Sequence, residues 1–252
     1  MPTIHTRVFA SPENGCSQLA SEIAQLVRGR CAIGRKLVLG LATGQSTLPL
    51  YDELAYLHRE EGLSFANVVT FNACEYHGLE PGHPSSARAY MDRHFFNLVD
   101  IPKANIHFLD GTVPAAQLDH HCSDYEKKIS RAGGIDYQIL GMGRSGSIGG
   151  NEPGSHIDSG TRLVQLAAST RREAQADFSN IAEVPTHVIT IGCRTILEAR
   201  KIVLLAWGVR TCRVIRRAIH GTISQALSAS YLRTHPVASI YLDSSSASLL
   251  RK

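Results

Sequence analysis

Long hydrophobic runs are missing from this chain of 252 residues. No stretch approaches the roughly 18 consecutive apolar residues that a membrane-spanning helix needs. The beginning, MPTIHTRVFASPENG, also lacks the basic start and following apolar run of a signal peptide. We therefore predict a protein with no membrane partner.

Paired cysteines are missing as well. The six cysteines are scattered, without a CxxC pair or the spacing of metal ligands, at positions 16, 31, 74, 122, 193 and 212. This pattern argues against a disulfide framework and against a zinc site. We predict no bound metal and a reducing, cytoplasmic setting.

Charge of one sign is not in large excess, and aromatic residues make up only 6% of the chain. The net charge is +4, and the densest basic stretch, residues 210–217, has the spacing of an amphipathic helix. Such a stretch is more typical of a solvated helix face than of a nucleic-acid site. No aromatic-rich basic segment accompanies it, so we predict no nucleic-acid partner.

The chain does contain apolar strands that alternate with helical segments. Helices of 10–15 residues between strands are typical of right-handed crossovers and of a mostly parallel sheet covered on both faces. We predict one α/β domain, residues 1–252, without repeats or linkers. The expected strands are 36–42, 67–71, 106–108, 136–142, 186–191, 201–207 and 238–242, and the expected helices are 17–30, 50–61, 87–98, 115–132 and 211–220.

Functional groups of such a sheet gather at the carboxyl ends of its strands. Three loops occupy such places: 43–47, 72–76 and 141–153. In the first, Thr43, Gly44 and Ser46 present hydroxyl and backbone N–H groups before a helix, which is a good phosphate cradle. The third loop is rich in glycine but lacks the spacing of the dinucleotide fingerprint.

Several stretches together resemble the glucosamine-6-phosphate deaminase (isomerising) family. They include LATG, LPLYDELAYLHREEGLSFANVVTFN, EYHGL, HFFNLVDIP, ILGMGRSG, NEPGS, IVLLAWG and SYLRTHP. The likeness runs from about residue 36 to 243 and keeps the family's order and spacing. It implies a Rossmann-like, doubly wound α/β fold. It also implies an isomerisation of an amino-sugar phosphate coupled to loss of ammonia, with no metal or other cofactor.

The same resemblance shows where this chain departs from the family. The family pattern F-N-x-D-E-Y has a catalytic base at its Asp, and this chain has Cys74 there. In the (D/N)-G-H-I-x-F-N-E-P pattern, whose His and Glu help to open the sugar ring, the Asp/Asn, His and Phe are replaced and only Glu152 remains. The replaced positions of this pattern are Ser145, Ser147 and Gly150. Elsewhere, Ala87 replaces a common Tyr, Gly160 an Arg, Thr211 a phosphate-binding Lys, His220 a Glu and His156 a Ser.

Because these losses fall on the pocket and spare the strands and helices, our hypothesis is that the site was deliberately remodelled on a natural scaffold into a larger and less charged pocket. Our main hypothesis is a cysteine ester hydrolase. Cys74 would be the nucleophile, His156 or His220 the base, and Glu152 or Glu75 the group that orients it. Loops that include Gly143 would line the substrate pocket. The alternatives are residual glucosamine-6-phosphate deaminase activity and an inactive sugar-phosphate-binding protein. The small-molecule partner is accordingly an activated ester or a sugar phosphate, and the resemblance also allows a homo-oligomer.

Overall fold

A seven-stranded, fully parallel sheet forms the centre of the computed structural model, which describes residues 3–250. Its order is β1-β10-β9-β6-β2-β3-β5. The inner strands are buried along their length, as expected for strands covered on both faces. The strands are β1 (His5–Phe9), β2 (Leu37–Leu41), β3 (Val68–Asn72), β5 (Ile106–His107), β6 (Tyr137–Gly141), β9 (Lys201–Ala206) and β10 (Ala238–Asp243).

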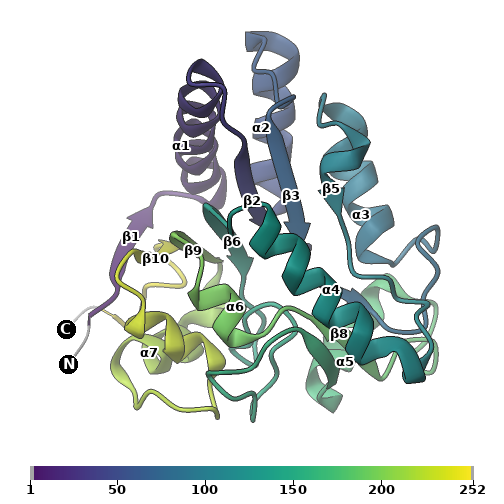
Figure 1. Cartoon of the computed structure of the whole chain (residues 1–252). Helices are drawn as coiled ribbons and strands as arrows, with labels where there is room; N and C mark the ends of the chain where they lie inside the picture. Colours follow the sequence, from purple (N-terminus) through teal and green to yellow (C-terminus); the bar gives the residue numbers. More distant parts are fainter. Residues whose placement is uncertain (1–2, 251–252) are drawn as a thin grey trace.

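Helices cover both faces of this sheet (Figure 1), and each face has its own hydrophobic core. The core on one face includes α1 (Pro12–Ala32), α2 (Leu48–Glu61) and α3 (Ala87–His94). The core on the other face includes α4 (Leu118–Arg131), α6 (Cys193–Leu197) and α7 (Cys212–His220). The predicted α/β class, a mostly parallel sheet between two layers of helices, is therefore confirmed.

The sheet is extended on both sides of β2, first on one side and then on the other. The chain runs outward from β2 through β3 to β5, then returns to place β6 on the other side of β2, with Leu39 opposite Tyr137. From β6 it continues outward through β9 to β10. The gap between the carboxyl ends of β2 and β6 is therefore the topological switch point, where ligands of open α/β sheets bind.

A second, antiparallel sheet lies beside the first, in the order β4-β8-β7. It consists of β4 (Cys74–Tyr76), β8 (His187–Thr190) and β7 (Arg162–Gln165). Helix α5 (Ala168–Ala174) follows β7 in the chain. The sequence predicts the β8 strand but neither β4 nor β7. In particular, Cys74 does not lie on an open turn as expected, because it pairs with Thr190 in this small sheet.

Short elements account for most remaining differences from the predicted pattern. The helices expected at 87–98 and 115–132 are each divided into an α-helix and a 3₁₀ turn. Helix α1 begins at Pro12 rather than near residue 17, because Ser11 caps it by accepting a hydrogen bond from the Asn14 N–H. The 3₁₀ helices are Phe96–Leu98, Lys103–Asn105, Ala115–Gln117, Gln175–Asp177, Val209–Thr211 and Ser228–Thr234.

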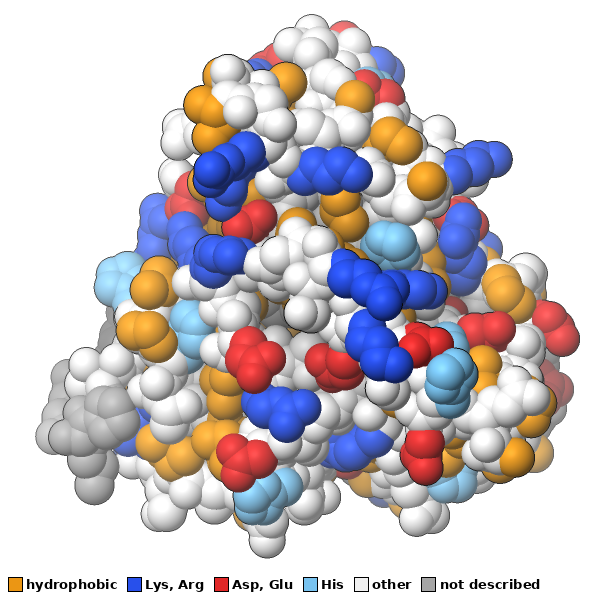
Figure 2. Space-filling view, viewed as in Figure 1, with side chains coloured by type: hydrophobic (Ala, Val, Ile, Leu, Met, Phe, Trp, Pro, Cys, Tyr) orange, Lys and Arg blue, Asp and Glu red, His pale blue; other side chains and the backbone are white. Residues whose placement is uncertain are grey.

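Within residues 3–250, no helix is both long and apolar enough to cross a bilayer. In the same range, no three His, Cys, Asp or Glu side chains gather where they could hold a metal ion. Figure 2 shows blue and red side chains interspersed over one face of the molecule, with hydrophobic side chains in small groups. The view therefore shows no extended patch of one sign on that face.

Candidate functional site

The 43–47 loop lies at the switch point and is held rigidly. Its Gly44 carbonyl accepts hydrogen bonds from the Thr47 N–H at 3.1 Å, the Thr47 hydroxyl at 3.0 Å and the Tyr90 hydroxyl at 2.9 Å. The Ser46 carbonyl accepts one from Trp207 Nε1 at 2.9 Å, which ties the loop to the end of β9. Gly44 has φ +117°, a conformation that favours glycine.

Three backbone donors of this loop, in contrast, are unused. No hydrogen bond among the described residues involves the backbone N–H of residue 44, 45 or 46. These N–H groups directly precede α2, whose first turn adds the positive end of the helix dipole. A side chain at Gly141 would collide with Ser46 Oγ, so the loop also contacts the end of β6. The loop thus offers an anion three adjacent N–H groups.

Cys74 is half-buried at the start of β4, two residues after β3 ends. Burial, together with the nearby charge of Glu75, raises the pKa of its thiol to about 12. Among the described residues no hydrogen bond reaches its sulfur, from a histidine or from any other donor. The thiol is therefore held in its protonated, weakly nucleophilic form.

Neither candidate histidine is placed beside Cys74 by a hydrogen bond. The exposed His156 instead faces its own loop, with Nδ1 accepting from the Asp158 N–H at 3.3 Å and lying 3.5 Å from Asp158 Oδ2. His220 is exposed at the end of α7. A Cys–His pair requires direct hydrogen-bond reach, about 2.6–3.2 Å, looser in unliganded sites.

Glu75 is buried and fully engaged in capping α3. Its carboxylate accepts hydrogen bonds from the backbone N–H groups of Tyr76 at 2.8 Å, Ala87 at 2.8 Å and Arg88 at 3.0 Å. Burial raises the pKa of this carboxyl, although these three N–H groups pull it down. Since Ala87 gives its N–H to Glu75 and is itself buried, both residues serve the start of the helix rather than orienting a base.

The glycine-rich loop is also well anchored. The Ser145 hydroxyl lies 3.1 Å from the Ser147 hydroxyl and accepts from the Ser147 N–H at 3.3 Å. Ser228 holds the far side by donating to the Asn151 carbonyl at 2.7 Å. These hydrogen bonds therefore hold the loop in one conformation beside the site.

Gly150 does not enlarge the pocket, contrary to expectation. A Cβ there would lie 2.7 Å from Val188 Cγ2 and 2.9 Å from Thr190 Cβ, so these side chains fill the space. Its N–H is also used, because it donates to Thr190 Oγ1 at 3.0 Å. Gly150 therefore supports the small antiparallel sheet and has neither room nor a free donor for a substrate.

Glu152 is buried, with 5% of its surface exposed, and its Oε2 has no hydrogen-bond partner. Burial raises the pKa of this carboxyl, Thr170 and the Ala167 backbone lower it, and the charge of Glu173 raises it again. A buried carboxyl group with one free oxygen is the type of group that catalytic sites use for proton transfer.

Glu173, in α5, is a site residue that the sequence does not predict. Its Oε2 lies 3.8 Å from the position of a Cβ on Gly143, and its Oε1 lies 3.5 Å from Arg144 Nε. The Glu173 carboxylate therefore lies against the glycine-rich loop. The sequence carries no signal for this, because Glu173 belongs to a short polar helix far along the chain.

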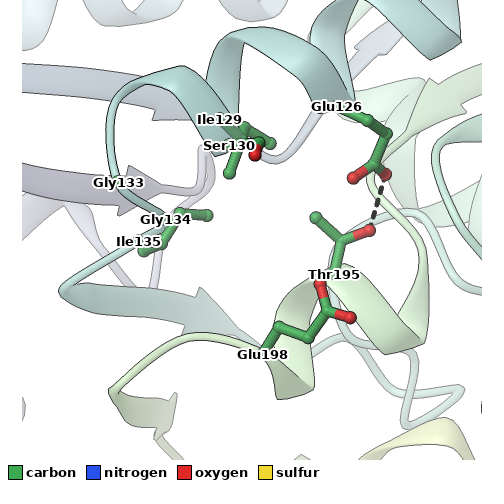
Figure 3. Close-up of a pocket in the computed structure, with 8 residues that line it drawn as sticks. All are labelled: Glu126, Ile129, Ser130, Gly133, Gly134, Ile135, Thr195 and Glu198. Atoms are coloured by element: carbon green, nitrogen blue, oxygen red, sulfur yellow. Dashed lines mark hydrogen bonds between the residues drawn. The ribbon is translucent and has the colours of Figure 1, made fainter.

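A surface hollow also lies elsewhere on the molecule. It has a volume of about 360 Å³ between α4 and α6, near the amino ends of β6 and β9. Figure 3 shows Glu126 and Glu198 facing it from the two helices, with a hydrogen bond from the Thr195 hydroxyl to Glu126, 2.6 Å long. Because it lies at the opposite edge of the sheet from the three loops, it is separate from the candidate site.

Known proteins share both the sequence and this architecture. A family model described as glucosamine-6-phosphate isomerases/6-phosphogluconolactonase matches residues 10–244. The chain belongs to this family. A glucosamine-6-phosphate deaminase of Arthrobacter sp. (strain FB24) is 42% identical over 94% of this chain and 90% of its own length. Glucosamine-6-phosphate deaminase 1 of Giardia intestinalis is 41% identical over 96% and 88%.

Solved structures of the family agree. A structure described as a monomeric glucosamine-6-phosphate deaminase superimposes with a TM-score of 0.93 at 33% identity, over 98% of this chain and 100% of that chain. The 6-phosphogluconolactonase of Trypanosoma brucei superimposes with a TM-score of 0.79 at 18% identity, covering both chains completely, which shows a shared fold. The predicted Rossmann-like fold is thereby confirmed.

One replaced position has a clear structural role within the family fold. Thr211 is buried, and its hydroxyl donates to the Gly208 carbonyl at 2.9 Å. It therefore supports the turn before α7 and has no charge to offer a phosphate where the resemblance places a lysine.

Proposed function

We propose that this chain binds an amino-sugar phosphate at the switch point and catalyses its isomerising deamination slowly. The observation that carries this proposal is the 43–47 loop, whose three unused N–H groups form an anion cradle at the start of α2. Relatives that are over 40% identical are named glucosamine-6-phosphate deaminases, which supports the same substrate class.

The proposed activity is slow because the reaction needs a base for the C2 proton of the opened sugar. Removal of that proton and its return at C1, with passage of one proton from the amino group to O1, convert the amino aldehyde into a C2 imine with a C1 hydroxyl, and water hydrolyses this imine with loss of ammonia. The family base is a carboxylate, and here Cys74 is a thiol whose pKa of about 12 keeps it protonated. A missing acid–base group typically lowers the rate by ~10²–10⁴-fold.

The test is ammonia release from glucosamine 6-phosphate by the parent protein and two variants. Cys74→Asp restores the carboxylate and should raise kcat by ~10²-fold or more. Cys74→Ala, the matched control, should leave the low rate unchanged, because the protonated thiol moves no proton. If Cys74→Asp gained nothing, or if Cys74→Ala abolished the activity, the proposal would be wrong.

The phosphate cradle is tested separately by binding. Calorimetry should detect glucosamine 6-phosphate but not unphosphorylated glucosamine, and inorganic phosphate should compete. Binding without any ammonia release would favour the alternative of an inactive sugar-phosphate-binding protein. No competition by phosphate would remove the cradle from the proposal.

The cysteine ester hydrolase remains the second candidate, favoured by a half-buried thiol where the family has a carboxylate. The raised pKa of Cys74 and the absence of a hydrogen bond to its sulfur weigh against it. Brief incubation with an activated aryl ester, followed by intact mass measurement, decides the matter. An acyl adduct present in the parent and absent in Cys74→Ala would establish the nucleophile.

The setting follows from the same proposal. We expect one domain in a reducing cytoplasm, since all six cysteines are free. The homo-oligomer that the resemblance allows, and the deliberate remodelling of the pocket, remain hypotheses.

A further inference from the structure

Glu173 reaches across the glycine-rich loop to the site. The Gly143 Cβ position lies 3.8 Å from Glu173 Oε2 and also 3.8 Å from Ser147 Oγ. Glu173 and Ser147 therefore both flank Gly143, and Ser147 is the position at which the resemblance places a ring-opening histidine.

Glu173 is the more exposed of the two carboxyl groups at this loop. Its side chain is 34% exposed, and Arg144 Nε lies 3.5 Å from its Oε1. A molecule bound at the loop can therefore reach the Glu173 carboxylate from solvent.

Glu152 has the opposite surroundings. It is 95% removed from solvent, its Oε2 has no partner, and burial and the charge of Glu173 both raise its pKa. A buried carboxyl group with a raised pKa next to a more exposed carboxyl group is an arrangement in which the first can act as general acid and the second as general base.

We propose that Glu173 is the second acid–base group of this site and works with Glu152 to open the sugar ring; this inference rests on the proposed function. Glu173 takes the proton of the O1 hydroxyl, the C1–O5 bond breaks as the C1–O1 double bond forms, and Glu152 gives its proton to O5. One proton has moved from O1 to O5, Glu152 ends ionised and Glu173 protonated. Exchange with water restores the pair.

Ring opening can be measured without deamination, as the exchange between the two anomers of glucosamine 6-phosphate followed by magnetisation transfer. The parent protein should accelerate this exchange, and Glu173→Gln should lose ~10²-fold of the acceleration. The exposed Glu80→Gln serves as the matched control and should leave the acceleration unchanged.

A rescue variant separates catalysis from structural damage. Adding Ser147→His to Glu173→Gln places a titratable group at the neighbouring position and should recover at least ~10-fold. Acceleration that depends on Glu173 in a protein that releases no ammonia would support this inference while refuting the proposed deamination. Ammonia release with an unchanged Glu173→Gln variant would overturn the inference alone. No acceleration by the parent would overturn it as well.

Discussion

At the scale of single residues, the protonation state of Cys74 governs its chemistry. With a pKa of about 12, only ~1 thiol in 10⁴ is ionised at pH 8, and thiolate is the reactive form. We expect iodoacetamide to modify the exposed Cys31 well before Cys74, as measured by mass spectrometry of peptides. Modification of Cys74 first would show an activated thiol and would favour the hydrolase.

Glu152 gives a second prediction at this scale, from proton linkage. Its pKa is raised in the folded state, so the folded protein holds this proton more tightly than the unfolded chain, and the resulting stability is lost as pH rises through the folded pKa. Gln has no titratable proton, so the Glu152→Gln variant does not lose this stability as pH rises. The stability of the variant relative to the parent, measured by urea unfolding, should therefore increase from pH 4.5 to pH 8. A difference independent of pH would contradict the raised pKa.

Gly150 shows that the packing around a replaced position has changed together with it, so that the family residue alone would not fit. A Phe at this position would press against Val188 and Thr190, which lie within 3 Å of its Cβ. Overpacking of this kind typically costs about 1–3 kcal/mol, so Gly150→Phe should lower the unfolding midpoint in urea. Adding Val188→Ala should recover part of the loss, and no recovery would show that the strain lies elsewhere.

At the scale of elements, the start of α3 depends on one carboxylate. Glu75 accepts hydrogen bonds from the N–H groups of Ala87 and Arg88 in its first turn. Glu75→Ala leaves these buried donors unpaired, which should cost about 1–3 kcal/mol in the free energy of unfolding. Glu80→Gln, on the nearby surface, should stay within about 0.5 kcal/mol. Equal effects of the two changes would remove this role from Glu75.

Which elements the sequence predicts depends on their length and periodicity. Strand β2 is a continuous apolar run and β6 is apolar except for Gln138, and their position in the chain is enough to place the loops of the site. Strand β4 has only three residues, including a charged one, and pairs with β8 more than 110 positions later, so no local pattern marks it. The early start of α1 was readable, because Ser11 followed by Pro12 is a helix N-terminus signal.

The same limit applies to the site. The anion cradle is local, so its Gly, Ser and Thr residues predict it. The pairing of Glu152 with Glu173 depends on α5 folding back over the glycine-rich loop, which is a tertiary arrangement. The expected hydrogen bond between Cys74 and a histidine could not be tested from the sequence either. The positions of His156 and His220 relative to Cys74 depend on the tertiary fold.

At the scale of the whole molecule, one carboxylate joins α1 to four strands of the main sheet. Glu22 accepts hydrogen bonds from Arg7 and Tyr241 at 2.8 Å, from Lys201 at 2.8 Å and from Tyr137 at 3.3 Å. Burial opposes its ionisation, but these partners outweigh burial and lower its pKa. Its stabilising effect is therefore present above pH 4.5 and is lost as pH falls through the lowered value.

Glu22→Gln should accordingly destabilise the protein by about 1–3 kcal/mol at pH 7. The difference from the parent should shrink at pH 3.5, as measured by urea unfolding at both values. Glu61→Gln, which breaks an exposed ion pair with Arg28, should change stability by less than 1 kcal/mol. A Glu22→Gln effect that grows toward acid would contradict the lowered pKa.

The pairing of β1 with β10 has a consequence for synthesis on the ribosome. Residues 5–9 pair only with residues 239–243, so β1 has no neighbour in the sheet until β10 has been synthesised. Strands β2, β3 and β5 can assemble once residues up to 107 have been made, with α1 and α2 to cover them. The nascent chain therefore carries β1 unpaired while the rest of the sheet grows, and β10 completes the sheet when it enters between β1 and β9.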